Sequence, residues 1–174
     1  MDGTVTRIDR PASTSGYLAD EIVPVRHAII EIRESDDIFD DSYGETTTDD
    51  DGYYSFSFCD DDGLNSTLEL YLQLTAEIRV NGHYVVNVQD ISWLDEIYRY
   101  ETDIWESDGG HTTANVELTR GQSAIFNMAE AVLDAWTFWN ASGGAPGEDS
   151  IFDPEAEVLY EPGWGYDNSF FDRY

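Results

Sequence analysis

Two acidic turns contain the residues whose types and spacing best suit metal binding. Three consecutive aspartates precede a glycine twice, first before Gly52 and again before Gly63. Carboxylate and turn carbonyl oxygens are the ligands that calcium prefers, with about six to eight oxygens around each ion. The sequence therefore predicts calcium ligands at the two turns, which are Asp49, Asp50 and Asp51 in the first and Asp60, Asp61 and Asp62 in the second.

The two turns lie too far apart to share one ion. Residues 53–59 alternate as a strand, and a rise of about 3.3 Å per residue puts the turns about 20 Å apart. Either turn could combine with the acidic loop at residues 36–41. Neither turn has the spacing of the calcium loop in helix–loop–helix proteins. An acidic turn surrounded only by water and salt therefore stays open as the alternative.

Side chains that could catalyse a reaction do not form a known pattern. His27, His83 and His111 are isolated from one another, and the sequence contains no His-Glu-x-x-His or Ser-His-Asp signature. Close pairs of carboxylates, which glycosidases use, arise by chance because 37 of the 174 residues are acidic. No glycine-rich phosphate-binding motif is present. We therefore expect a protein that is not an enzyme and that binds no organic cofactor.

The overall charge restricts the possible partners. The chain has 37 acidic residues and 8 basic ones, all arginine, so its net charge is −29. Such a surface repels nucleic-acid phosphates and anionic lipids, so we expect neither nucleic-acid binding nor membrane insertion. Self-repulsion must be screened either by molar salt, where the Debye length is about 3 Å, or by bound divalent cations. The composition is similar to that of proteins from salt-loving archaea.

Residues 1–120 are expected to form one domain of β-strands. Apolar and polar residues alternate throughout residues 68–78, which is the period of a strand. The pair Asn81-Gly82 is typical of a type I′ hairpin turn leading into the next strand. Residues 46–48 and 53–59, separated by the first acidic turn, predict a second hairpin. Short strands between glycine and aspartate turns predict an antiparallel β-sandwich.

Residues 121–174 are expected to add one helix and an aromatic tail. Ser123 can cap a helix in which apolar residues recur every three or four positions, as one face of a helix requires. The tail at residues 162–174 has no regular period and is rich in aromatic side chains. Such side chains are rarely left in water, so we expect them to pack on the sandwich or on a neighbouring subunit.

One stretch of the sequence resembles a known superfamily. An apolar run at residues 25–32 is followed at residues 44–56 by the order Gly-x-Thr-x-Thr-Asp-x-x-Gly-x-Tyr-x-Phe, with Gly52 in the turn. This order resembles the carboxypeptidase regulatory-like and transthyretin-like superfamily, and it is similar to the Cna B-type repeats of bacterial surface proteins. The resemblance covers roughly residues 2–90. It implies a mainly β, antiparallel Greek-key sandwich of the transthyretin type and a non-catalytic role in secreted or surface-anchored proteins.

A second resemblance concerns the end of the chain. Residues 121–127 and 158–163 look similar to the segment that links such a sandwich to a zinc-peptidase-like domain in some large extracellular proteins. The resemblance implies a shared architecture and no activity of this chain.

These observations lead us to expect an extracellular or cell-surface structural module. It would be a building block of a filament, layer or adhesive stalk that self-associates or contacts a neighbouring surface protein or domain. Two alternatives stay open, an accessory domain of a larger secreted metallopeptidase-like protein and a carbohydrate-binding module, which predicts a row of exposed aromatics on one sheet face. Asn65 and Asn140 begin N-glycosylation sequons, which matter in an exported glycoprotein.

Overall fold

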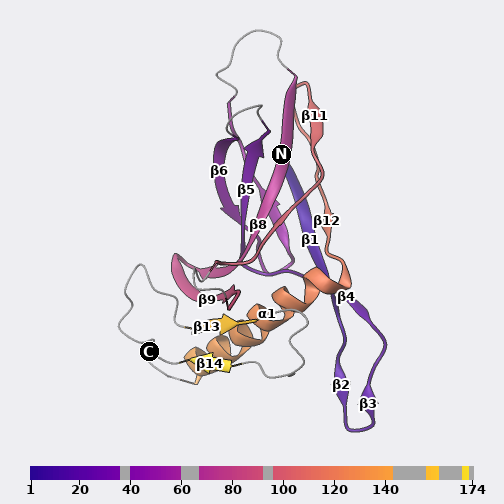
Figure 1. Cartoon of the computed structure of the whole chain (residues 1–174), viewed down its shortest axis with the longest axis vertical. Coiled ribbons are helices and arrows are strands. Elements are labelled where there is room, and N and C mark those ends of the chain that lie inside the picture. Colours follow the sequence, from indigo (N-terminus) through magenta and orange to yellow (C-terminus); the bar gives the residue numbers. More distant parts are fainter. Residues whose placement is uncertain (36–39, 60–66, 92–95, 143–155, 161–169, 173–174) are drawn as a thin grey trace.

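The chain folds into strands and one long helix (Figure 1). The computed structural model describes residues 1–35, 40–59, 67–91, 96–142, 156–160 and 170–172. The elements are β1 (Asp2–Asp9), β2 (Ala12–Ser13), β3 (Gly16–Tyr17), β4 (Glu21–Pro24), β5 (Ala28–Glu34), β6 (Asp41–Thr47), β7 (Tyr53–Ser55), β8 (Leu68–Val80), β9 (His83–Gln89), β10 (Arg99–Glu101), β11 (Trp105–Ser107), β12 (Val116–Glu117), α1 (Arg120–Ala141), β13 (Ala156–Leu159) and β14 (Phe170–Asp172).

Two sheets form a sandwich-like arrangement, which confirms the mainly β prediction. In the smaller sheet, β1 lies between β12 and β4 and also pairs with β7. In the larger sheet the order is β14-β13-β9-β8-β5-β6, and β10 and β11 also pair with β8. Both sheets are mixed rather than wholly antiparallel, because β12 joins β1 and β13 joins β9 in parallel. Parallel neighbours need long connections, and β13 is reached through the helix.

The core lies between the sheets and continues under the helix. Strand β8 places Leu72, Leu74 and Ile78 in it, as the alternating pattern predicts. The smaller sheet contributes Val5 and Tyr54, and α1 covers one end with three buried apolar side chains. Those three are Phe126, Ala129 and Leu133.

Strand pairing differs from the sequence prediction around the first acidic turn. The predicted hairpin between residues 46–48 and 53–59 is wrong, because β6 pairs with β5 whereas β7 pairs with β1 in the other sheet. The apolar run at residues 22–33 is likewise divided between the sheets, as β4 and β5. His27 lies at this division with a φ of 56°, a left-handed conformation that interrupts a strand. Both segments therefore cross from one sheet to the other.

The turn between β8 and β9 confirms the type I′ prediction. Asn81 and Gly82 have φ values of 52° and 83°, and a type I′ turn needs positive φ at both central residues. The strands on either side pair antiparallel, with Val80 opposite His83.

The N-cap of the helix lies four residues before the predicted one. Thr119 is the N-cap, and its backbone N–H donates to the side chain of Gln122 at 2.8 Å. Ser123 is instead buried against β1, where its Oγ accepts a hydrogen bond from the backbone N–H of Ile8 at 2.9 Å. The prediction of Ser123 as the cap is therefore wrong, because its hydroxyl bonds to the sheet.

The C-terminal elements pack on the sandwich. Figure 1 shows α1 lying crosswise at the lower end of the strands, where it contacts β9, β1 and β8. Strand β13 extends the larger sheet beyond β9, and β14 pairs with β13. The rest of the predicted aromatic tail lies outside the described residues. Among the described helices, none is long and apolar enough to cross a membrane.

The backbone at Gly52 lies close to β1, at the point where the chain crosses between the sheets. Its φ is 73°, and a Cβ there would lie 2.6 Å from the backbone oxygen of Val5. Gly82 has a similar φ of 83° but open space around it. We expect Gly82→Ala to lower the free energy of unfolding by about 1–2 kcal/mol through backbone strain alone, and Gly52→Ala to lower it by more. Urea denaturation of both variants measures the difference, and equal losses would contradict the close approach.

Candidate functional site

The first acidic turn uses its carboxylates to hold the backbone. The Oδ1 atom of Asp49 accepts hydrogen bonds from the backbone N–H groups of Asp51 and Tyr53, both at 2.9 Å. Asp50 lies 2.9 Å from Nε2 of His27. Within the described part of the chain, no group of three or more His, Cys, Asp or Glu residues could hold a metal ion. Two of these carboxylates thus have hydrogen-bond partners within the protein, and calcium binding at Asp49, Asp50 and Asp51 stays a prediction.

Of the other predicted site residues, the structure describes only Asn140. Asp60, Asp61 and Asp62 fall outside the described residues, so calcium binding there stays a prediction, and so does Asn65 as a sequon. Asn140 lies in the last turn of α1. The structure does not bring Asn140 close to the first acidic turn, which is at the sheet crossing.

A buried ionic cluster joins the helix to the smaller sheet. The Glu130 side chain is only 3% exposed, and its carboxylate accepts three hydrogen bonds from Arg26. These bonds come from the backbone N–H at 2.6 Å, from Nε at 2.7 Å and from one terminal nitrogen of the guanidinium. Arg26 also contacts Asp134 at 2.7 Å, and Arg7 contacts Glu130 at 3.9 Å. Arg7 donates a further hydrogen bond to Asn127 of the helix.

Burial and ion pairing act in opposite directions on the two arginines. Burial lowers the pKa of Arg7, and the carboxylate of Glu130 offsets this only in part. Burial also acts to lower the pKa of Arg26, but hydrogen bonds to Asp134 and Glu130 outweigh it and raise the pKa above its ordinary value. Two guanidinium groups and two carboxylates thus balance one another at the junction.

The sequence contains a signal for this cluster that the strand pattern alone does not reveal. Gly3, Val5 and Arg7 share one face of β1, and all three are buried. An arginine on the inward face of a strand requires a buried partner. Glu130 interrupts the buried face of the helix in the same way. An inward-facing arginine and an inward-facing glutamate in one sequence therefore predict that the two side chains lie close together.

Glu130 and Asp134 both pair with Arg26, but replacing them should change the free energy of unfolding by different amounts. We expect Glu130→Ala to lower the free energy of unfolding by about 3–5 kcal/mol, because it leaves Arg26 and Arg7 without their buried partner. The Asp134 side chain is 69% exposed, so Asp134→Ala should cost no more than about 1 kcal/mol. Urea denaturation in high salt measures both variants. Similar losses would show that Glu130 has no special role.

The outer face of the larger sheet carries a second network of polar side chains. Arg79 contacts Glu77 at 2.8 Å and Glu45 at 2.7 Å, and its guanidinium lies 4.2 Å from the ring centre of Tyr84. Burial raises the pKa of Glu77 above that of an ordinary glutamate, and Arg79 offsets this only in part. The folded protein therefore holds the proton of Glu77 to a higher pH than the unfolded chain does.

Glu77 should consequently make the protein less stable as the pH rises. Its unfavourable contribution begins above about pH 4.3, the pKa of an exposed glutamate, and is complete once the pH exceeds the raised pKa. We expect Glu77→Gln to remove this decline in the free energy of unfolding. Glu45→Gln, which alters a 57% exposed partner of the same arginine, should keep it. Urea titrations from about pH 4 to about pH 7 measure both; identical pH profiles for wild type and Glu77→Gln would contradict this.

Exposed aromatic side chains do not form the row that a flat sugar-binding face would need. Among the described residues, the large aromatics with high exposure are Tyr17, Tyr53, Phe138 and Trp139. They lie on β3, β7 and α1 rather than on one sheet face. The larger sheet instead carries the charged network around Arg79.

A pocket opens where the two sheets meet at one side of the sandwich. Its volume is about 280 Å³. Figure 1 shows β11 and β12, which contribute to its walls, on the same side of the molecule. The lining residues are Leu72, Tyr100, Thr102, Asp103, Trp105, Ala114, Asn115, Val116 and Glu117. The sequence analysis did not bring these residues together, because they belong to strands whose pairing is not local.

Comparisons with known proteins assign this chain to no family. No protein-family model matches the chain, and no curated protein matches it. A crystal structure of a 9R-lipoxygenase from Cyanothece PCC8801 is similar over 67% of this chain and 15% of that chain. Its sequence identity is 14% and its TM-score is 0.31, and a similarity this low carries no argument about function.

Proposed function

We propose that the chain is a non-catalytic structural module that works outside the cell as a building block of a surface filament, layer or stalk. The observation that supports this most is the hairpin of β2 and β3, which pair only with each other within the described residues. Figure 1 shows this arm projecting from the body past the start of α1. We call residues 11–20 the arm.

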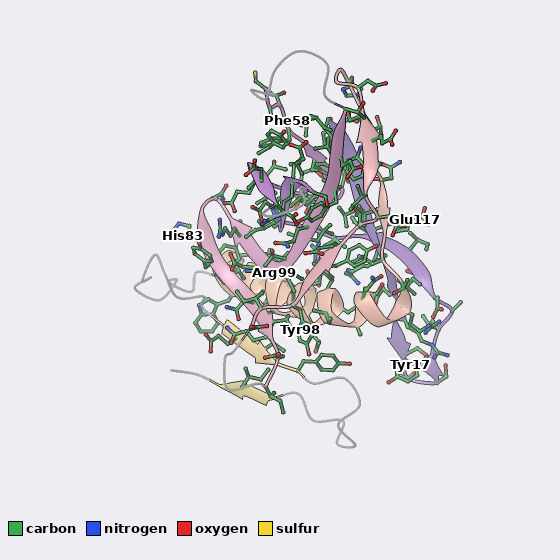
Figure 2. All side chains as sticks on the ribbon, turned by 45° about the horizontal axis from the view of Figure 1, so that its top comes forward. Tyr17, Phe58, His83, Tyr98, Arg99 and Glu117 are labelled. Carbon is green, nitrogen blue, oxygen red and sulfur yellow. The ribbon has the colours of Figure 1, made fainter. Side chains whose placement is uncertain are left out.

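Apolar side chains are exposed along the arm and at its base. Tyr17 is 73% exposed, Leu18 is also exposed, and Ile22 of β4 is 70% exposed. Figure 2 shows Tyr17 on the arm, away from the core. Exposed apolar side chains that lie together on a protein surface mark contact sites. These exposed side chains suit the arm to docking on a neighbouring subunit or surface protein.

Ion pairs at the base hold the arm in place. Arg120, the first residue of α1, forms an ion pair with Asp20, and Arg10 lies 3.9 Å from the same carboxylate. The guanidinium of Arg10 also lies 5.2 Å from the ring centre of Tyr17. A held arm loses less conformational entropy on docking than a free one, which favours a role in assembly.

The assembly proposal predicts that the arm controls the oligomeric state. We expect the wild-type chain to form oligomers in molar salt, and the double variant Tyr17→Ser, Leu18→Ser to be monomeric because the apolar contact is lost. Tyr53→Ser, at an exposed aromatic on β7, should leave the oligomers intact. Size-exclusion chromatography with light scattering measures the masses, and thermal denaturation confirms that each variant is folded.

A wild-type chain that stays monomeric at all concentrations would contradict assembly and favour the alternative of an accessory domain. That alternative has its own support in the C-terminal elements. Strand β13 pairs in parallel with β9 near the edge of the larger sheet, and helix α1 contacts both strands. Such an arrangement suits a junction with an α/β domain, in keeping with the resemblance to segments that precede zinc-peptidase-like domains.

A further inference from the structure

The pocket between the sheets is lined by both aromatic and polar residues. Tyr100 on β10 and Trp105 on β11 are half-buried, and both contribute to its lining. Both strands pair with β8, where Tyr100 lies opposite Leu74 and Trp105 opposite Leu70. Side chains on paired strands are held in position before a ligand arrives. The aromatic rings are therefore a preformed part of the pocket wall.

The polar lining residues offer hydrogen-bond groups that the protein does not use itself. The Oδ1 atom of Asn115 accepts bonds from the backbone N–H of Thr4 at 3.0 Å and from its hydroxyl at 3.1 Å. These bonds orient the amide and leave its Nδ2 group available as a donor. The side chains of Asp103 and Glu117 are exposed, and neither carboxylate forms an ion pair or hydrogen bond with another described residue. Figure 2 shows Glu117 at the side of the molecule.

We propose that this pocket binds a single neutral sugar ring, as the end or one unit of a glycan. A sugar ring has an apolar C–H face that packs on aromatic rings, and hydroxyl groups that both donate and accept hydrogen bonds. Its hydroxyls can donate to the two carboxylates and accept from Asn115. The volume of about 280 Å³ is near the lower end of ligand pockets, roughly 300 Å³, which suits one ring.

Other classes of ligand fit the same groups less well. An anion is repelled by Asp103 and Glu117, and by the net charge of −29. A hydrocarbon would remove water from both carboxylates without replacing its hydrogen bonds. An organic cation would satisfy the carboxylates and the aromatic rings but would face the N–H groups of Asn115, which also carry partial positive charge. The mixture of donor and acceptors thus favours a hydroxyl-rich ligand.

Asn115→Asp distinguishes a sugar from a cation. The variant keeps an oxygen for Thr4 and replaces the free N–H₂ donor with a carboxylate oxygen. A bound sugar should weaken by about tenfold, because the hydrogen bond from the amide to a sugar hydroxyl is lost, whereas a cation should bind more tightly. Asn81→Asp adds the same charge in the distant β8–β9 turn and should change neither affinity. Thermal denaturation of both variants shows that they are folded.

The test is calorimetric titration of the full chain in molar sodium chloride with maltose, cellobiose, N,N′-diacetylchitobiose and choline. Saturable binding of at least one sugar that weakens in Asn115→Asp and persists in Asn81→Asp supports the proposal. No saturable binding of any of the three sugars overturns it. Sugar binding that is unchanged in Asn115→Asp also overturns it, because the sugar then binds elsewhere. Choline binding that tightens in Asn115→Asp, without sugar binding, assigns the pocket to a cation instead.

Discussion

The buried carboxylate of Glu130 is the constraint on which the arrangement of the helix depends. A charge taken out of water must keep its partners, since losing one costs several kcal/mol. Arg26 supplies a backbone and a side-chain donor to the same carboxylate, and Arg7 adds a second positive charge. If the helix rotated or slid on the smaller sheet, Glu130 or one of the two arginines would be left buried without its ion-pair partner. Its first residue, Arg120, pairs with Asp20 at the base of the arm, so the arm's position follows from the helix.

Most of the arginines in the part of the chain that the structure describes pair with carboxylates of the same chain. Arginines pair with carboxylates at the helix junction, at the base of the arm and on the outer face of the larger sheet. Few positive charges are left to neutralise the remaining surface acids, so close contact between copies needs salt to screen their repulsion. In the proposed assembly, the projecting arm would make the contact at a distance from the acidic body. The same acidic surface favours uncharged or hydroxyl-rich ligands over anionic ones in the pocket.

Local patterns predicted the elements better than their pairing. Alternation in residues 68–78 and the pair Asn81-Gly82 depend on neighbours in sequence, so the strand and the turn could be predicted. The partner of β7 depends on β1, some fifty residues away, and the hairpin assignment was therefore wrong. The ionic cluster at Glu130 and the pocket at Asn115 could not be predicted for the same reason. Each joins segments that are distant in sequence and that meet only in the folded sheets. Ser123 reads as a cap until its bond to Ile8 is known.

The Glu130 cluster should make the helix and the sandwich unfold as one unit. Native-state hydrogen exchange, measured amide by amide in molar salt, tests this most directly. If the claim holds, the amides around Glu130 in α1 exchange with the same free energy of opening as those of β5 and β8, because both open only on global unfolding. Helix amides that exchange through a much smaller free energy, while the strands stay protected, would show that the helix detaches by itself and would contradict the account.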